Sequence, residues 1–354
     1  MRPAHHGGDE RTRMTTAHHP AAAPTAEPGP GTTGPAPSVL VLGGTGFLGR
    51  HICAAFGATG ARLTRVAREA PVDASDVPFI RVDLMDATSE RIAEILGATG
   101  ADIVVNSVGA VWHVGEREMY EANAELVRRL VAAMTSMPGR PRLVHLGSIH
   151  EYGPVPRGTR ISEEVPTAPD TTYGRSKLLG ARLVLDAAAE GTLDGTVLRI
   201  ANVAGPGTPR ESLLGILARR LRERARAAAG EPPPVLRLAP LTAWRDFVDV
   251  RDVAGAVVAA ARADVCGQVV NIGSGEAVEV RQVVRRLVAL SGLSLTVVED
   301  QDRDEQRGDL QWQRCDVSLA LRLLGWQPQL SLERSLHDLL VETGVGVLTR
   351  SGGA

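Results

Sequence analysis

Tyr173 and Lys177 are the residues of this chain whose types and spacing point most directly to chemistry. A spacing of four residues places a phenol and an ammonium on one face of a helix. A phenol has an ordinary pKa of about 10, and a nearby cation favours the phenolate and lowers that pKa. The pair is therefore typical of a proton-transfer site, although a solvated lysine beside a half-buried ring has the same pattern.

Ser148 closes a second segment that can carry chemistry. The apolar run from Leu143 to Leu146 predicts a buried strand, and Ser148 follows it directly. Parallel sheets present their ligands at the carboxyl ends of the strands, so this hydroxyl can lie beside a substrate carbonyl. A turn or capping serine is the alternative interpretation.

A glycine-rich turn lies between the apolar strand segment Ser38 to Leu42 and an apolar-periodic helix through Phe56. Its sequence is Gly43-Gly44-Thr45-Gly46-Phe47-Leu48-Gly49. Glycines in this arrangement permit a tight turn, close approach of the backbone to a pyrophosphate, and packing of the helix on the sheet. The helix N-terminus supplies N–H donors, so the unit predicts dinucleotide binding.

With these features in place, the chain resembles the extended short-chain dehydrogenase/reductase family, in particular its nucleotide-sugar branch, from Ser38 to about Glu342. Further family motifs occur in order: Asp83-Leu84, Asn106-Ser107-Val108-Gly109, Glu151-Tyr152-Gly153, Leu198-Arg199-Ile200-Ala201-Asn202, Gly205-Pro206-Gly207, Arg245-Asp246-Phe247-Val248, Asn271-Ile272-Gly273-Ser274-Gly275 and Leu324-Gly325-Trp326-Gln327-Pro328. The resemblance implies an α/β fold with a doubly wound parallel-sheet (Rossmann) domain and a smaller, interleaved C-terminal substrate domain. It also implies a homodimer.

The resemblance assigns roles to the residues described above. Ser148, Tyr173 and Lys177 become the catalytic residues: Tyr173 protonates the alkoxide that forms after hydride transfer, Ser148 hydrogen-bonds the same oxygen, and Lys177 acidifies Tyr173 and holds the nicotinamide ribose. The residues implied to bind the cofactor are Gly43, Thr45, Gly46, Phe47, Leu48, Gly49, Asp83, Leu84, Val108, Gly109, Asn123, Tyr173 and Lys177.

The end of the second strand bears on the choice of cofactor. The family's acidic residue, which binds the adenosine ribose, falls on Ala67, and Arg65 and Arg68 lie close by. Because arginine suits a 2′-phosphate, we predict NADPH in preference to NADH or NAD. Glu69 is the alternative acid if the register differs by two residues.

NADPH indicates net reduction, because an epimerase of this family keeps and recycles its cofactor. We therefore predict reduction of a keto group, at C4, of a nucleotide-activated hexose or deoxyhexose. The alternatives are an NAD-dependent nucleotide-sugar 4-epimerase, a reductase of a ketone or aldehyde that is not a sugar, and a non-catalytic NAD(P)-binding protein.

Ile149 and His150 argue against a hexose 4,6-dehydratase. In dehydratases of the family an Asp-Glu pair stands at these two places, and isoleucine cannot move a proton. His150 can titrate near neutrality and assist a different proton transfer, or be a histidine hydrogen-bonded in a loop.

The resemblance also names residues for the substrate's diphosphate. Asn202, Arg245 and Arg307 are implied to bind it, with Arg303 as a rival of Arg307. A salt bridge to Asp246 or Asp249 is the alternative role of Arg245.

The bulk properties narrow the class of protein. With 354 residues and 44% hydrophobic composition the chain can bury a large core, and its net charge of −2 gives no reason to expect nucleic acid. No apolar run is long enough to span a bilayer. The three cysteines lack metal-ligand spacing, so we predict buried thiols, no metal site and a cytoplasmic protein.

The remaining patterns predict the elements that position the site. Short apolar segments (62–66, 79–82, 103–106, 143–146 and 196–200) alternate with helical ones (123–134 and 173–189), which indicates a parallel sheet. A helical stretch from Ala218 to Ala229 carries Arg219, Arg220, Arg222, Arg224 and Arg226, interpreted as a solvated face, with phosphate binding by one of them as the alternative.

We predict four segments along the chain. Residues 1–37 form a disordered tail, 38–204 the Rossmann domain, 205–345 the substrate domain, and 346–354 a flexible C-terminus. Residues 245–274 partly return to the Rossmann domain.

Overall fold

The computed structural model describes residues 35–71, 76–111, 114–227, 232–300 and 311–347. Outside these ranges lie most of the predicted tail, the residues Arg303 and Arg307, and the last seven residues. A compact unit runs from Ala36 to the end of the chain. The domain boundary at 205, the homodimer and the cytoplasmic location stay predictions.

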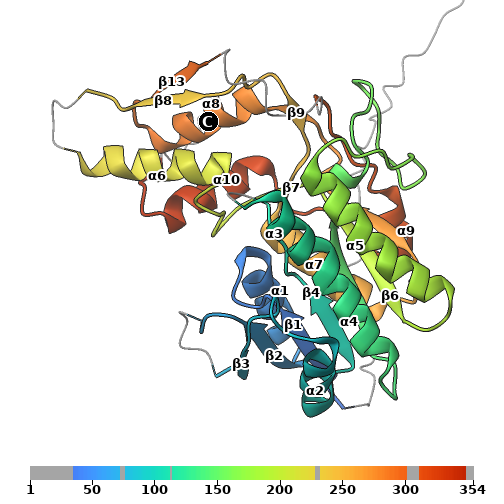
Figure 1. Cartoon of the computed structure of the whole chain (residues 1–354). Helices are drawn as coiled ribbons and strands as arrows, with labels where there is room; N and C mark the ends of the chain where they lie inside the picture. Colours follow the sequence, from blue (N-terminus) through green and yellow to red (C-terminus); the bar gives the residue numbers. More distant parts are fainter. Residues whose placement is uncertain (1–34, 72–75, 112–113, 228–231, 301–310, 348–354) are drawn as a thin grey trace, which may run out of the picture. The chain divides into compact units, whose positions relative to one another are not determined.

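A seven-stranded parallel sheet forms the centre of this unit (Figure 1). The strand order is β11-β6-β5-β4-β1-β2-β3, so the chain winds outward from β1 in both directions, as predicted. The strands are β1 (Ser38–Leu42), β2 (Arg62–Ala67), β3 (Phe79–Arg81), β4 (Ile103–Asn106), β5 (Arg142–Ser148), β6 (Gly195–Ile200) and β11 (Val269–Ile272). Their carboxyl ends meet at one edge, which holds the candidate site.

Both faces of the sheet are covered by helices, which is why the strands are apolar throughout. Val39 and Val41 of β1 belong to the core under α1 (Phe47–Gly57) and α7 (Val250–Arg262). Leu40 and Leu42 belong to the core under α2 (Ser89–Thr99), α4 (Leu126–Thr135) and α5 (Thr172–Ala189). Full burial of each such side chain contributes about 1.5–3 kcal/mol.

The helix predicted over 123–134 is longer and interrupted. It begins with α3 (Glu116–Tyr120), continues as a π-helical segment, η1 (Glu121–Glu125), and ends as α4. A Cβ atom at Gly180 of α5 would lie 2.1 Å from the backbone oxygen of Asn123, so only glycine allows this close approach. The π segment thus lies directly against the helix that carries Tyr173 and Lys177.

A third core lies outside the sheet. It is formed by α6 (Leu213–Arg226), α8 (Val280–Ser291) and α10 (Leu332–Glu342) with the parallel pair β8 (Val235–Leu238) and β13 (Thr296–Glu299). The helix α6 begins five residues before the predicted start, because Ser212 caps it by accepting a hydrogen bond from the N–H of Gly215. The remaining elements are β7 (Asn202–Ala204), β9 (Trp244–Arg245), β10 (Phe247–Asp249), β12 (Val278–Glu279), α9 (Ser318–Leu324) and the 3₁₀ turn η2 (Ile149–Glu151).

Two predictions from the composition, on the cysteines and on membrane spans, can be compared with the structure. Cys53 and Cys315 are buried free thiols, but Cys266 is exposed, so the prediction of three buried thiols was wrong for that residue. Among the described residues, no helix is long and apolar enough to cross a membrane.

Candidate active site

Ser148, Tyr173 and Lys177 lie together at the carboxyl end of β5. Tyr173 is the second residue of α5, whose N-cap, Thr171, accepts a hydrogen bond from the N–H of Gly174. A Cβ at Gly174 would lie 2.4 Å from the backbone oxygen of His150, so glycine lets the start of α5 contact the turn η2. The Tyr173 hydroxyl consequently reaches the side chain of Ser148 and hydrogen-bonds it.

Lys177 is buried one helical turn further along α5. Its Nζ donates a hydrogen bond of 2.5 Å to the backbone oxygen of Leu146 in β5. Burial lowers the pKa of Lys177 to about 8, and the carboxylate of Glu151 opposes that shift. An amine with this pKa is close to the operating range of a proton relay at neutral pH.

Lys177 was expected to lower the pKa of Tyr173, but this pKa is raised. Burial raises the pKa of Tyr173, the hydrogen bond from Ser148 lowers it, and the charge of Glu151 raises it further. The reason is geometric: the ammonium of Lys177 is turned to the Leu146 carbonyl. Tyr173 is therefore a protonated phenol at neutral pH.

His150 lies edge-on to the ring of Tyr173, with the two ring centroids 5.5 Å apart. Burial and the positive charge of Arg245 lower the pKa of His150 to about 4. The idea that His150 titrates near neutrality was therefore wrong, because a neutral imidazole faces the phenol.

Glu151 lies beside the candidate site, and the sequence reasoning named it only within a family motif and gave it no role. It is fully buried, and its Oε1 accepts a 2.7 Å hydrogen bond from the N–H of Ser148. Its Oε2 pairs at 2.7 Å with Nε of Arg199, itself 5% exposed. The carboxylate therefore fixes the backbone that presents Ser148, and its charge acts on both Tyr173 and Lys177.

The Glu151–Arg199 pair extends into a buried network. The guanidinium of Arg199 lies 4.5 Å from the centroid of the Tyr152 ring, and the Tyr152 hydroxyl donates to Oδ1 of Asn271 in β11. The motifs Glu151-Tyr152-Gly153, Leu198–Asn202 and Asn271–Gly275 thus meet in space, which no spacing within the chain reveals.

The residues of the glycine-rich turn fit a dinucleotide. Gly43 has φ +77°, and a Cβ at Gly49 would lie 2.1 Å from the Gly43 backbone oxygen, so both positions require glycine. Gly46 caps α1 without a side-chain oxygen, which leaves the first N–H groups of the helix to a phosphate. Thr45, Phe47 and Leu48 lie at this helix start.

Asn123 and Gly109 lie beside Lys177, although Asn123 has other partners. Its amide bonds the backbone of Ala110 through both atoms and also donates to Ser176. A Cβ at Gly109 would lie 3.1 Å from Oδ1 of Asn123 and 4.0 Å from Nζ of Lys177. Asn123 therefore positions the loop that holds Val108 and Gly109.

The two arginines predicted to bind a 2′-phosphate differ in exposure. Arg68 is exposed just after β2, whereas Arg65 is 2% exposed and packs against Gly44 under the glycine-rich turn. Asp83 forms a turn by accepting from the N–H of Met85, and Leu84 is buried. Arg68 is therefore an accessible cation at this end of the sheet, and Arg81 at the end of β3 is exposed beside it.

The candidate substrate residues lie on β7 and β9. Asn202 donates to the backbone oxygen of Asp246 and to Gln313. Asp246 bonds Ser274, Gly275 and Cys315, and Asp249 bonds Arg251 and Ser335. The positive charge of Arg245 acts on His150. Its salt bridge to Asp246 or Asp249 stays a prediction. In the described ranges, no cluster of acidic, histidine or cysteine side chains is placed to hold a metal ion.

Replacement of Lys177 by methionine is expected to raise stability at pH 7. The folded pKa of about 8 lies below the ordinary 10.5, so the fold bears the full cost of the buried charge below pH 8, on the order of 3 kcal/mol. The cost falls as the pH rises from 8 to 10.5 and then vanishes. Urea unfolding at pH 8 and at pH 10.5 measures the difference in the free energy of unfolding between variant and parent.

The exposed Arg175 of the same helix provides the control, because Arg175→Met should change stability little at either pH. If the difference in unfolding free energy between Lys177→Met and the parent is the same at both pH values, the proposed cost of burying the charge is contradicted.

Comparisons with known proteins show to which proteins the chain is similar. A model of the NAD dependent epimerase/dehydratase family matches residues 39–273. The dTDP-6-deoxy-L-talose 4-dehydrogenase (NAD(P)(+)) of Kitasatospora kifunensis is 40% identical over 301 residues, which are 85% of this chain and 94% of that protein. The UDP-glucose 4-epimerase of Azospirillum brasilense is 27% identical over 346 residues, 88% of this chain and 96% of the epimerase.

A solved structure has a similar fold. MoeE5 in complex with UDP-glucuronic acid and NAD superposes with a TM-score of 0.75 at 28% identity, over 87% of this chain and 99% of that chain.

Proposed function

The chain belongs to the NAD-dependent epimerase/dehydratase family, and we propose that it uses NADPH to reduce the C4 keto group of a nucleotide-activated 6-deoxyhexose. The observation that carries this proposal is the protonated Tyr173 phenol, hydrogen-bonded to Ser148 at the carboxyl end of β5. A reduction needs a proton donor at this place, and the phenol of Tyr173 can supply that proton.

Each catalytic side chain has a defined task in this reaction. When bound, the dinucleotide supplies the hydride. Ser148 and Tyr173 hydrogen-bond the keto oxygen, and Tyr173 gives its proton to that oxygen as negative charge develops. Lys177, with a pKa of about 8, lies one helical turn further along α5 and would hold the nicotinamide ribose.

The side chains that follow Ser148 support reduction over dehydration. Ile149 has no proton to transfer, and His150 is neutral with a pKa of about 4. Glu151 is a buried carboxylate, but its two oxygens already bind Arg199 and the N–H of Ser148. Elimination of water would lack its acid and base.

The substrate class follows from the most informative relative. A dTDP-6-deoxy-L-talose 4-dehydrogenase acts at C4, and the reverse of such an oxidation is reduction of a 4-ketone. We extend this to a dTDP-linked 4-keto-6-deoxyhexose here, with Asn202, Arg245 and Arg307 at the diphosphate.

NADPH is the proposed cofactor because Ala67 replaces the acidic residue after β2 and Arg68 is exposed beside it. Arg68→Ala is expected to raise the KM for NADPH by about 10-fold to 100-fold, the worth of a charge-assisted contact, and to leave the KM for NADH nearly unchanged. Steady-state kinetics with both cofactors measures this. Arg62→Ala, at the other end of β2, is the control, and a parent enzyme that prefers NADH would refute the assignment.

The 4-epimerase remains the second candidate, supported by the 27% identity to a UDP-glucose 4-epimerase over most of both chains. An epimerase should be isolated with bound nicotinamide and should not consume added cofactor. The reductase should oxidise NADPH in a one-to-one ratio with a dTDP-4-keto-6-deoxyhexose. Absorbance of the purified protein and of this assay at the reduced-nicotinamide band separates the two.

A further inference from the structure

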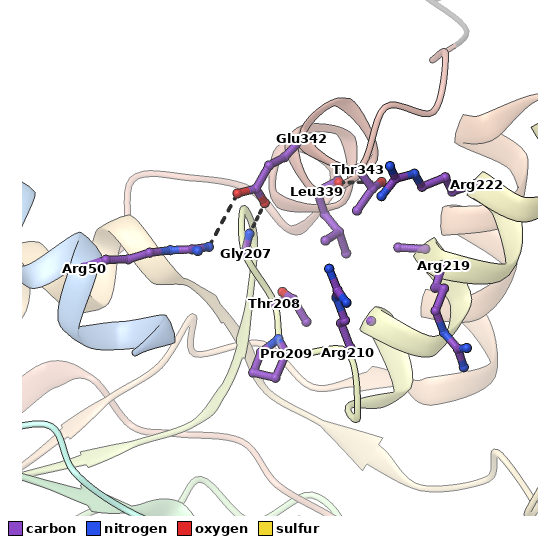
Figure 2. Close-up of a pocket in the computed structure, with 12 residues that line it drawn as sticks. Arg50, Gly207, Thr208, Pro209, Arg210, Arg219, Arg222, Leu339, Glu342 and Thr343 are labelled. Atoms are coloured by element: carbon purple, nitrogen blue, oxygen red, sulfur yellow. Dashed lines mark hydrogen bonds and ion pairs between the residues drawn. The ribbon is translucent and has the colours of Figure 1, made fainter. Parts of the chain in front are cut away.

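A cavity of about 430 Å³ lies among the loop 207–210, α6, α10 and the side chain of Arg50 on α1 (Figure 2). Its walls include Thr208, Pro209, Leu339 and Thr343. None of the residues assigned above to catalysis, cofactor or substrate lines it.

Positive charge dominates the residues that line this cavity. Four are arginines, Arg50, Arg210, Arg219 and Arg222, and one is an acid, Glu342. Glu342 is already engaged, because one carboxylate oxygen lies 3.5 Å from Nη2 of Arg50 and the other accepts a hydrogen bond from the N–H of Gly207. In Figure 2 this carboxylate is turned toward Arg50 and Gly207, away from the centre of the cavity.

Arg210 and Arg222 are left without a countercharge. Within the described part of the chain, neither pairs with an acidic side chain. The Nε atom of Arg222 is buried and has no hydrogen-bond partner among the described residues. Figure 2 shows the guanidinium of Arg210 pointing toward Leu339 and that of Arg222 toward Thr343, so both face the cavity. Arg219, at the rim, pairs weakly with Glu223 at 3.7 Å.

We propose that this cavity binds a small molecule that carries a phosphate or pyrophosphate group, held by Arg210 and Arg222. The guanidinium fork matches phosphate oxygens in pairs, and an anion here would satisfy a buried donor that the fold leaves unsatisfied. The volume is that of a small-ligand pocket. Two of the arginines come from the helix first interpreted as a solvated face.

The lining residues give such a ligand a structural effect. They belong to the loop after β7, to α6, to α10 and to α1, and the carboxylate of Glu342 on α10 joins Arg50 of α1 to Gly207 of the loop. An anion between Arg210 of the loop and Arg222 of α6 would replace repulsion between two cations by attraction of both to the anion. Binding should therefore stabilise the folded chain by mass action.

The test is a binding and melting experiment on the full chain with inorganic phosphate, pyrophosphate and glucose 1-phosphate, at constant ionic strength with chloride as reference. NADPH is kept saturating so that its own phosphate site is filled. We expect at least one of the three probes to bind and to raise the Tm. The double variant Arg210→Ala/Arg222→Ala should weaken that binding about tenfold or more and abolish the Tm shift.

Arg224→Ala, on the same helix but outside the cavity lining, is the matched control and should bind like the parent. The relative affinities distinguish a free inorganic anion from a phosphate ester. The proposal is overturned if none of the probes binds, or if binding is equal in the parent and the double variant. Since the readout is binding rather than turnover, a negative result leaves the proposed reductase activity unaffected.

Discussion

Tyr173→Phe is expected to lower kcat by about 10²–10⁴-fold, because it removes the phenol hydroxyl that hydrogen-bonds Ser148. The ring and its contact with His150 remain, so the affinity for NADPH should be nearly unchanged. Single-turnover kinetics and cofactor titration separate the two effects.

Tyr152→Phe is the matched control for this variant. Tyr152 is also buried, but its hydroxyl donates to Asn271 in the structural network rather than to the site. It should lose stability, by about 1 kcal/mol, with the chemical step intact. Turnover by Tyr173→Phe at the parent's rate would refute the role assigned to the phenol.

Glu151→Gln is expected to destabilise the fold by about 3–5 kcal/mol, because it leaves the buried guanidinium of Arg199 without its countercharge. Adding Arg199→Met to the same chain should recover part of that loss, since no unpaired charge then remains. Denaturant unfolding of the two single variants and the double variant measures the coupling.

The same variant also has a kinetic signature. Because Glu151 raises the pKa of Tyr173, its loss should lower that pKa. The reduction needs the protonated phenol, so as the pH rises its activity should begin to fall at a lower pH than in the parent. The basic limb of the kcat/KM profile should therefore shift to the acid side. A merely structural role of Glu151 would leave the limb in place.

Glu94→Gln serves as the control for stability. Glu94 forms an exposed ion pair with Arg91, with side chains 66% and 54% exposed, and should cost less than about 1 kcal/mol. If Glu151→Gln lowers the free energy of unfolding by no more than this, the Glu151–Arg199 pair does not stabilise the fold as proposed.

Much of the fold could be predicted from the chain because its strands are short, apolar and buried on both faces. β1 and β4 have the predicted bounds, and the pattern of alternating strands and helices gave the parallel sheet. The π segment Glu121–Glu125 could not be predicted, since no sequence pattern marks a π-helix and its contact with Gly180 is made between two helices. The β8–β13 pair and the early start of α6 were also missed, because short strands and a single capping serine give weak local signals.

The candidate site shows the same division. The types and spacing of Tyr173, Lys177 and Ser148 predicted a cluster that the structure brings together. Glu151 was missed because its importance rests on Arg199, 48 residues later, across two adjacent strands. The available signal was a carboxylate at the end of an apolar segment, and such a carboxylate must find a cation. The pKa of Tyr173 was misjudged because a spacing shows nearness to Lys177 but not the burial that opposes it.

The central claim is that this site delivers hydride to a sugar ketone and a proton from Tyr173 to its oxygen. The most direct measurement follows the hydride, by incubating the protein with a dTDP-4-keto-6-deoxyhexose and NADPH that carries deuterium at the transferable position. The account predicts one deuterium at C4 of the product sugar for each NADPH oxidised. A sugar product without deuterium, or epimerised sugar formed while NADPH stays unconsumed, would contradict it.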